Sequence, residues 1–351
     1  MHGGLSTADD RTDATDRVVI ERAATDDDDP DLSVVVVTYN EADRIADCLE
    51  AIFEACRGVT SFEVLLVDSN STDETVAIAS EYDVTIHRIP DDSLTTPGAG
   101  RYVGMQYASG DTLLFVDGDV VVSEPWLAAA FETLHTEPNL AGVDGHLNER
   151  RADEAANVEY CHGVAMYDRT ALTEVGGFHP FLAAWEDVDL GFQLRLAGYD
   201  LHRLALVAGT HPVPDSALDQ FRRWRRGYYR AGGQVCSKAL TRPALLGRWL
   251  WYFRDKIVST TWLVLGLLSL IQPPLAGLWA LLTGAGVTVL CHRLGVDGAA
   301  RRAISMVLFP LGFVLGFETL SDRDSFPLDA VETVQTGSVW HPDRPRPSTT
   351  D

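Results

Sequence analysis

Two carboxylates, Asp117 and Asp119, stand one residue apart where the apolar run TLLFVD (112–117) comes to its end. Most residues from 113 to 119 suit a buried strand, yet burying a carboxylate is costly unless an opposite charge compensates it. The pair is therefore expected at the rim of a sheet, where a cation and a ligand can reach it.

Two other apolar runs, LSVVVVT (32–38) and EVLLVD (63–68), are typical of short buried strands. The first ends in Thr38, Tyr39, Asn40 and Glu41, and the second ends in Asp68. Ligands of open α/β sheets bind beyond the carboxyl ends of the strands. These side chains are therefore expected to converge on one site with the two carboxylates.

Strand-like and helix-like segments alternate through the first third of the chain. A further strand is predicted over 84–89, and helices are predicted between the strands, over 40–56, 71–82 and 98–109. Ser71 lies three residues before Glu74, which is the spacing of a capping box. The alternation predicts an α/β fold with a mostly parallel, doubly wound sheet.

Later segments bring charged residues to defined places. Apolar spacing after Trp185 puts Glu186 and Asp187 in the first turn of a helix, where the helix dipole favours negative charge. A predicted strand over 202–210 ends before His211, and a lone histidine is more often structural than functional. The segment DQFRRWRRGYYR (219–230) is predicted to be one basic, aromatic helix.

Composition limits the partners of the chain. The formal net charge is -23, and Lys238 and Lys256 are its lysines. Such a chain repels a phosphate backbone, so nucleic acid is not an expected partner. Abundant Asp with little Lys is typical of proteins adapted to high salt, with a merely acidic protein as the alternative. Residues 1–31 lack apolar periodicity and are predicted to be a disordered acidic arm.

The chain becomes strongly apolar from Ile257 onwards. Three pieces without charge follow, at 257–271, 274–291 and 303–317. Each is near the lower length limit for crossing a bilayer, and buried core helices are the alternative. Basic residues flank them, which predicts that both flanks of the first two pieces are cytoplasmic and that these pieces form a hairpin turning at Pro273. The third piece would leave the following tail outside, unless it is re-entrant.

Five stretches in order resemble the family 2 glycosyltransferases, which have the GT-A fold: VVVVTYNEADRI, VDSNSTDET, FVDGD, WEDVDLGFQLRLAGY and QFRRW. The resemblance covers about residues 32–235; a short acidic triplet alone is a weak signal, but the ordered set is strong. The expected divisions are an arm (1–31), a GT-A domain (32–240), an interfacial segment (241–256), a transmembrane region of two to three helices (257–320) and a polar tail (321–351). The expected location is the cell membrane, multi-pass, with the catalytic domain in the cytoplasm.

The resemblance implies a nucleotide-sugar donor and a bound Mg²⁺ or Mn²⁺. Asp119, helped by Asp117, would hold the metal, and His211 is a further candidate for the metal or a phosphate. The donor would be bound by Thr38, Tyr39, Asn40, Glu41, Asp68, Arg101 and Asp117. Packing, turn formation and helix capping are the alternative roles for the first three of these. Tyr102 stands where the family often has Asn after the arginine.

The resemblance also assigns the acceptor chemistry. Asp187 would be the general base of an inverting transfer, with Glu186 beside it, and helix capping is the alternative. Gln220, Arg223 and Trp224 match the QxxRW pattern of processive polysaccharide synthases, in which the Arg lies near the diphosphate and the Trp stacks on a sugar. The Arg cluster around them would equally suit anionic headgroups or a lipid-linked phosphate.

The expected function is transfer of a sugar from a nucleotide-sugar donor to a lipid-linked, dolichol-type acceptor at the cytoplasmic membrane face, in cell-surface glycan synthesis or protein glycosylation. A processive polysaccharide synthase is an alternative, although three short apolar pieces are few for a polymer channel. A non-catalytic membrane scaffold is another alternative. The presence of all the carboxylates of the family pattern, Asp68, Asp117, Asp119 and Asp187, argues against it. A nucleotidyltransferase would need a glycine-rich phosphate loop, which does not follow the first apolar run.

Overall fold

The four apolar runs of the first third form the parallel centre of one sheet. They are β1 (Leu32–Thr38), β2 (Phe62–Asp68), β3 (Thr85–Arg88) and β4 (Thr112–Asp117), in the order β3-β2-β1-β4. The computed structural model describes residues 29–212, 219–317 and 320–342, so most of the predicted arm lies outside the described residues. The predicted parallel strands are confirmed, because runs this apolar are satisfied only when both faces of the sheet are covered.

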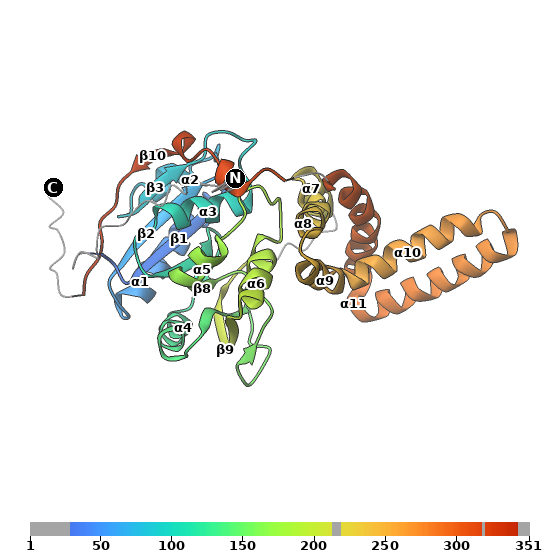
Figure 1. Ribbon diagram of the computed structural model, residues 1–351, viewed down its shortest axis with the longest axis horizontal. Coiled ribbons are helices and arrows are strands. Elements are labelled where there is room, and N and C mark those ends of the chain that lie inside the picture. The colour runs from blue at the N-terminus through green and yellow to red at the C-terminus, as the bar shows by residue number, and fades with distance from the viewer. Residues whose placement is uncertain (1–28, 213–218, 318–319, 343–351) are drawn as a thin grey trace, which may run out of the picture.

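The sheet has ten strands and continues beyond β4 in mixed directions. The added strands are β5 (Val121–Val122), β6 (Leu140–Leu147), β7 (Ala156–Asn157), β8 (Ala165–Asp168) and β9 (Asp200–Thr210). Strand β8 runs antiparallel to β4 and β6, whereas β6 and β9 are parallel. At the opposite edge, β10 (Glu332–Gln335) pairs antiparallel with β3. The sheet is therefore doubly wound in its first half and mixed in its second (Figure 1).

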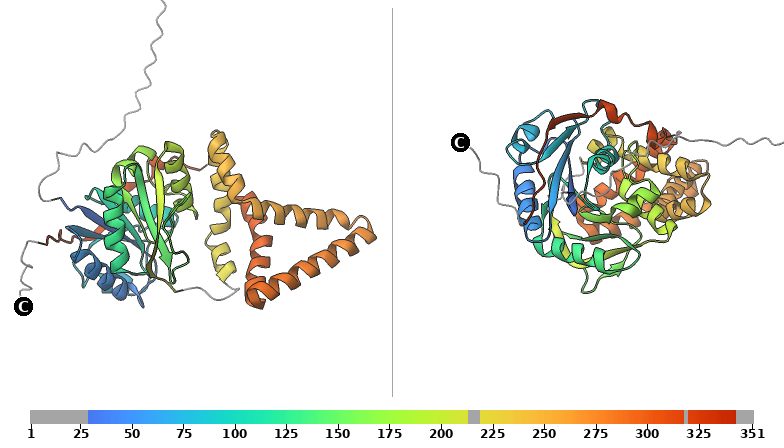
Figure 2. Two further views of the ribbon diagram at one scale, coloured as in Figure 1. Left: turned by 90° about the horizontal axis from the view of Figure 1, so that it is seen from below. Right: turned by 60° about the vertical axis from the view of Figure 1, so that its left-hand side comes forward.

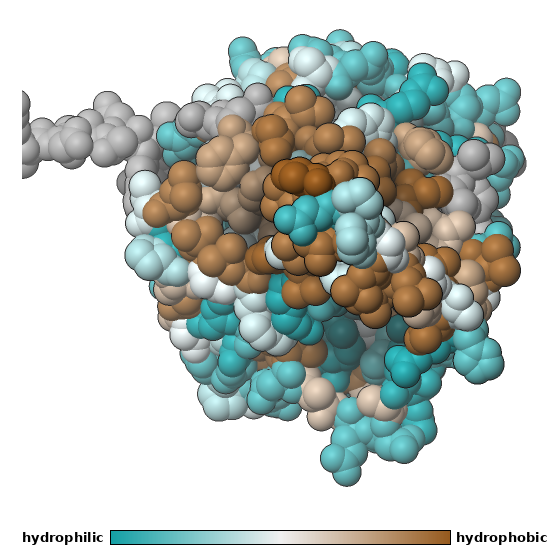
Figure 3. All heavy atoms as spheres, turned by 90° about the vertical axis from the view of Figure 1, so that its right-hand side faces the viewer, coloured by the Kyte–Doolittle hydropathy of each residue, from teal (hydrophilic) through white to brown (hydrophobic). Residues whose placement is uncertain are grey.

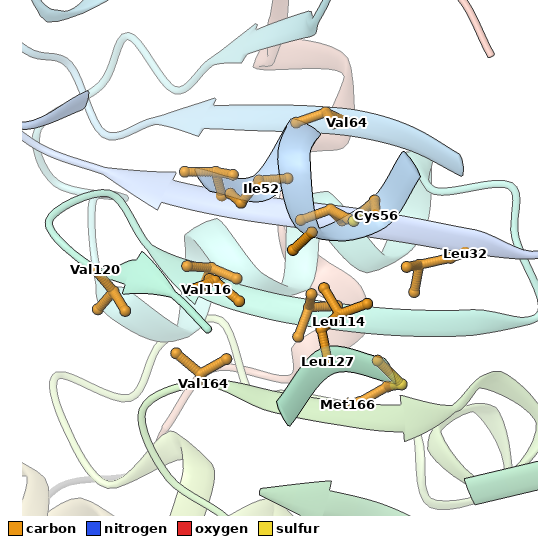
Figure 4. Close-up of a cluster of buried hydrophobic side chains, with 14 of the residues drawn as sticks. Leu32, Ile52, Cys56, Val64, Leu114, Val116, Val120, Leu127, Val164 and Met166 are labelled. Carbon is orange, nitrogen blue, oxygen red and sulfur yellow. The ribbon is translucent and has the colours of Figure 1, made fainter. Parts of the chain in front are cut away.

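Helices cover both faces of the sheet. On one face lie α1 (Ile45–Arg57), α2 (Thr75–Ala79) and α4 (Glu124–Thr136), and on the other lie α3 (Pro97–Tyr107), α5 (Arg169–Val175) and α6 (Glu186–Ala197). Alternate residues of each strand enter the two cores: Val34 and Val36 pack below α1, and Val35 packs below α3. Figure 4 shows the first core, with Ile52 and Leu127 over the strands.

A helical unit lies beside the sheet. It comprises α7 (Asp219–Arg225), a 3₁₀ turn η1 (Tyr228–Arg230), α8 (Ala231–Ala239), α9 (Pro243–Tyr252), α10 (Arg254–Ser269) and α11 (Pro273–Gly316). Helix α10 and the first half of α11 form a hairpin that projects away from the sheet (Figure 2). At Gly295, with φ of 72°, α11 breaks, and its second half returns to pack on α8 and η1. Two further 3₁₀ turns, η2 (Arg323–Ser325) and η3 (Leu328–Ala330), lead to β10.

Three local predictions are wrong. Ser71 does not cap a helix: its hydroxyl accepts a hydrogen bond from the Asn40 N–H, and α2 begins only at Thr75. The predicted helix over 219–230 is interrupted at Gly227, which adopts a left-handed φ of 79°. The third apolar piece does not carry the tail across a membrane, because β10 is hydrogen-bonded to β3 of the main sheet.

Among the described residues, one helix, Pro273–Gly316, is long and apolar enough to cross a membrane. The arrangement predicted for the membrane region was two to three spans. That multi-pass arrangement is not supported, since α10 is shorter than a full span and the second half of α11 is packed against the helical unit.

Candidate active site

The candidate site lies where the strand order reverses. Strands β2 and β4 both pair with β1, and their ends bring Asp68 opposite Thr38 and Asp117 opposite Val37. In open α/β sheets the crevice at such a reversal is the place where ligands bind. The structure brings Thr38, Asp68 and Asp117 together at the carboxyl ends of these strands.

The loop after β1 is held in place by the loop after β2. Asn40 adopts a left-handed φ of 56°, and its Oδ1 accepts a hydrogen bond from the Thr72 N–H at 2.8 Å. The Glu41 N–H donates to the Thr75 hydroxyl at 2.8 Å, and the Ala42 N–H donates to Asp73 at 3.2 Å. Residues 71–75 (STDET) thus fix the backbone of residues 38–41 (TYNE). The sequence analysis interpreted the spacing of Ser71 and Glu74 in this stretch as a helix cap.

Two buried polar atoms at the strand ends have no partner among the described residues. They are Oδ1 of Asp68, whose side chain is fully buried, and Oγ1 of Thr38. The other carboxylate oxygen of Asp68 accepts the Ser71 N–H at 2.9 Å, while burial raises the pKa of Asp68. Buried polar groups are almost always paired, so these two oxygens leave room for hydrogen bonds from a ligand or from water.

Arg101 joins the two acidic motifs. Its guanidinium donates to Asp117 at 2.7 Å and to Glu186 at 2.9 Å, and the side chain is almost fully buried. Burial raises the pKa of Glu186 to about 7, which Arg101 counteracts and the neighbouring Asp187 reinforces. Arg101 therefore positions carboxylates from β4 and α6 side by side.

Asp119 lies in a hollow of about 340 Å³ with His211, and its Oδ2 lies 3.4 Å from the His211 Nε2. Burial raises the pKa of Asp119, His211 lowers it, and Asp117 raises it. Burial also raises the pKa of Glu41, and Asp119 adds to that rise. Among the described residues, no group of three His, Cys, Asp or Glu side chains is arranged to hold a metal ion. Asp119 and His211 form a pair that offers oxygen and nitrogen to a divalent cation, whose shell would need water or phosphate to be complete.

Gly118 allows the acidic motif to lie against β1. A Cβ atom at this position would stand 2.9 Å from Oγ1 and 3.0 Å from Cβ of Thr38. A larger residue would therefore push Asp117 and Asp119 away from the end of β1.

Asp187 lies in the first turn of α6, as predicted. The preceding Trp185 adopts a left-handed φ of 59°, a rare conformation for a bulky residue that is often found at functional sites. Burial raises the pKa of Asp187, and Arg101 lowers it. A half-buried carboxylate with a raised pKa is suited to proton transfer.

Aromatic residues connect this helix start to the helical unit. The Trp185 ring lies 5.1 Å from Phe253, 6.4 Å from Tyr252 and 6.3 Å from Phe309, between ring centroids. Tyr252 and Phe253 stand at the junction of α9 and α10, and Phe309 belongs to the returning half of α11. The candidate base is thus packed against the segments that carry the apolar hairpin.

The QFRRW segment contributes from a short helix, α7. Gln220 accepts a hydrogen bond from the Tyr229 hydroxyl, and the half-buried Trp224 lies 6.1 Å from the Tyr229 ring. Arg223 is exposed. It is Arg226 that contacts the predicted nucleotide loop, with its guanidinium 5.3 Å from the centre of the Tyr39 ring.

Sequence reasoning missed two further groups. Tyr228 lies close to the acidic residues: burial raises the pKa of its phenol, Glu186 adds to this rise and Arg226 opposes it. Tyr228 lies in RRGYYR, directly after QFRRW, and this closeness to a motif could have marked it as a candidate site residue. The second group is the fully buried Asp144 of β6, which accepts two hydrogen bonds from Arg203. Their separation of 59 residues left no local signal.

Comparisons with known proteins agree with this geometry. Residues 33–176 match the family model described as Glycosyl transferase family 2. Glycosyltransferase AglE of Haloferax volcanii is 26% identical over 267 residues, covering 70% of this chain and 83% of that protein. A dolichyl N-acetyl-alpha-D-glucosaminyl phosphate 3-beta-D-2,3-diacetamido-2,3-dideoxy-beta-D-glucuronosyltransferase of Methanococcus voltae is 28% identical over 141 residues, covering 37% and 44% respectively.

The fold has a close counterpart among solved structures. The mannosyltransferase PcManGT from Pyrobaculum calidifontis, solved with GDP-Man and Mn2+, superposes with a TM-score of 0.58 at 19% identity. The match covers 85% of this chain and 91% of that one. The sheet, the matched residues 33–176 and the ordered motifs together show that the first half of this chain carries a domain similar to glycosyl transferase family 2, with the GT-A fold.

Proposed function

We propose that this protein transfers a sugar from a nucleotide-sugar donor to an acceptor carried on a membrane lipid. The observation that carries the proposal is the packing of Trp185, two residues before Asp187, on aromatic residues of α9 and α11. That packing puts the candidate base beside the helices that carry an exposed apolar hairpin. An acceptor held in a membrane would meet the carboxylate there.

The donor nucleotide would lie over the ends of β1 and β2. The free oxygens of Asp68 and Thr38 would accept hydrogen bonds from a base or ribose, and the fixed TYNE loop, from Thr38 to Glu41, would line the pocket. Tyr39, backed by Arg226, offers a flat face on which a base can stack. Arg101 supports this pocket from below, since its guanidinium is already held by Asp117 and Glu186.

A divalent cation, Mg²⁺ or Mn²⁺, would be held by Asp117 and Asp119, with His211 as a further ligand. When bound, such an ion neutralises the charge that develops on the departing diphosphate. The solved mannosyltransferase complex contains Mn2+, which supports this choice by likeness of fold. Exposed arginines of α7, including Arg223, would offer additional positive charge to the diphosphate.

Asp187 would accept the proton of the acceptor hydroxyl as that oxygen attacks the anomeric carbon and inverts it. Where the acceptor is a phosphate that is already ionised, the same carboxylate would only orient it. Trp224 and Gln220, packed against Tyr229, would form the acceptor side of the site. The relative in Methanococcus voltae is named for a dolichyl phosphate-linked substrate, which supports a dolichol-type acceptor.

The test uses membranes that contain the full chain, at high salt with Mg²⁺ or Mn²⁺, and a panel of labelled nucleotide-sugars. We expect one donor to pass its label into the lipid fraction extracted by organic solvent. The Asp187→Asn variant should reduce this transfer by about 10²- to 10⁴-fold, the usual contribution of a general base, while leaving donor binding intact. Asp111→Asn changes an exposed carboxylate just before β4, at the other end of that strand from Asp117; it is the matched control and should keep full activity.

Other outcomes have defined meanings. Label in insoluble, high-mass material would favour a processive polysaccharide synthase, the reading that QFRRW also allows. No transfer from any donor, with native lipids present and the protein folded, would overturn the enzymatic proposal and favour a membrane scaffold.

A further inference from the structure

The hairpin of α10 and α11 exposes a continuous apolar surface. Residues 257–291 contain no charged side chain or histidine, in a chain whose net charge is -23. At the turn, Leu270 is 70% exposed and Ile271 is 79% exposed. Figure 3 looks onto this end of the molecule and shows apolar residues spread across its face. An apolar patch of this extent on an otherwise acidic protein indicates contact with lipid.

The charges sit at the base of the hairpin. Arg254 and Lys256 precede the first arm, and His292 and Arg293 follow the second. Trp251, 60% exposed, lies under the Arg254 guanidinium at 4.2 Å, an arrangement typical of a membrane interface. The ends of both arms nearest the sheet therefore suit the headgroup region of a bilayer. Anionic headgroups would complement the positive charge of the basic residues there.

The turn is built for a medium without water. The N–H groups of Leu270, Ile271 and Gln272 donate to carbonyls of the preceding helical turn, and those of Leu275 and Ala276 donate to the Gln272 carbonyl. The two residues between, Pro273 and Pro274, have no N–H to satisfy. No backbone N–H from 270 to 276 is left without an acceptor, which meets the donor part of the requirement for backbone surrounded by lipid.

The arms satisfy their own polar groups in the same way. The indole N–H of Trp279 donates to the Trp262 carbonyl at 3.0 Å, and that of Trp262 donates to the Thr283 hydroxyl at 3.1 Å. Gly266 makes room for this contact, since a Cβ there would stand 2.4 Å from the Trp279 ring. Interhelical hydrogen bonds and small residues at the contact are typical of helix pairs in membranes.

The first arm is too short to cross. From Ile257 to Ile271 an α-helix rises about 22 Å at about 1.5 Å per residue. The hydrocarbon core is about 30 Å thick. The arms also diverge from the turn towards their bases (Figure 2), so their depth along the membrane normal is smaller still.

The second half of α11 does not enter the bilayer as a further span. Gly312 and Gly316 pack on η1 so closely that a Cβ at Gly316 would stand 1.8 Å from the Arg230 carbonyl oxygen. The opposite side of this half exposes Val307, Leu311, Val314 and Leu315. A helix with one face docked on protein and the other apolar lies along a membrane surface.

We propose that residues 257–291 form a re-entrant anchor, which enters and leaves the bilayer through the face that the sheet occupies and ends inside the hydrocarbon core. Residues 296–316 lie along that same face. The turn at Ile271 therefore reaches neither aqueous phase. This inference shares with the proposed function only the attachment to a membrane and needs no sugar transfer to be tested.

The test places a single cysteine at the turn, Ile271→Cys, in the full chain with Cys291→Ser as background. The protein is added to the outside of sealed vesicles of phosphatidylcholine and phosphatidylglycerol and allowed to bind. We expect a membrane-impermeant maleimide to leave this thiol unmodified whether it is added outside or trapped inside, and to modify it after detergent is added. Asp153→Cys, on an exposed loop of the catalytic domain, is the control and should react from outside. The remaining native cysteines are buried.

Two results would overturn the proposal. Modification from the lumen would mean that the hairpin spans the bilayer, and modification from outside on vesicle-bound protein would mean that it lies on the surface. A second variant gives an independent reading. Ile271→Arg should release the protein from vesicles by about tenfold or more, because its charge would enter hydrocarbon, whereas Leu196→Arg on the catalytic domain should not. Unchanged binding of Ile271→Arg would contradict a buried turn.

Discussion

The buried guanidinium of Arg101 is the residue on which the two acidic motifs depend. The sequence predicted it as a donor-binding residue, and in the structure its guanidinium pairs with Asp117 and Glu186. The motif residues themselves could be predicted, because Asp117 and Asp187 lie in short, ordered stretches of sequence. Their connection through Arg101 could not, since it joins side chains that are 16 and 85 residues apart.

The charge of Arg101 helps to set the pH at which Asp187 works. Asp187 must be ionised to accept a proton, and burial raises its pKa while Arg101 lowers it, so activity falls as pH falls through that raised value. Arg101→Gln removes a neighbouring positive charge, which raises the pKa of Asp187 further. We expect the acid limb of kcat to move to higher pH, as measured by the pH profile of transfer at saturating donor.

The control for this profile is Glu124→Gln, an exposed carboxylate at the start of α4. Its acid limb should coincide with that of the unaltered protein. An acid limb of Arg101→Gln that stays in place or moves to lower pH would contradict the role given to Asp187.

At the scale of elements, a buried ion pair between Asp189 of α6 and Lys238 of α8 connects α6 to the helical unit. The Lys238 ammonium of α8 donates to Asp189 at 2.5 Å, and Gln193 donates to the same carboxylate at 2.9 Å. Burial lowers the pKa of Lys238, which Asp189 counteracts. The helix that begins with the candidate base is therefore held by the unit that carries the hairpin.

Lys238→Met should lower the free energy of unfolding by about 3–5 kcal/mol, because it leaves the Asp189 carboxylate buried without its partner. Denaturant titration of the detergent-solubilised protein measures this. The double variant Lys238→Met/Asp189→Leu removes both charges and should recover most of the loss. A single variant as stable as the unaltered protein would mean that the pair contributes little.

Elements were predictable where the signal is local. The apolar runs of β1, β2 and β4 form strands wherever helices cover both faces of the sheet, so they could be recognised from the sequence. Strand β10 was not predictable, because Glu332–Gln335 is polar and becomes a strand only by pairing with β3, almost 250 residues earlier. Likewise, Ser71 is used by Asn40 across 31 residues, and no local spacing shows such a contact.

At the scale of the molecule, the chain carries a large excess of negative charge. The -23 net charge makes the folded state repel itself, and added salt screens that repulsion. We expect the unfolding temperature of the solubilised protein to rise continuously with KCl from low to molar concentration. NaCl should act alike at equal ionic strength, since screening does not depend on the cation. An unfolding temperature independent of salt would contradict self-repulsion as a limit on the stability of the folded state.

The pairing of β10 with β3 also imposes an order on synthesis. The ribosome makes Glu332–Gln335 after both arms of the hairpin, so the outer edge of β3 stays uncovered while residues 257–291 leave the exit tunnel. An uncovered strand edge is a place where chains aggregate. The last strand of the sheet can be added only when the apolar hairpin has already emerged, so a nascent chain whose hairpin is not yet covered exposes that apolar surface and an unfinished sheet edge together.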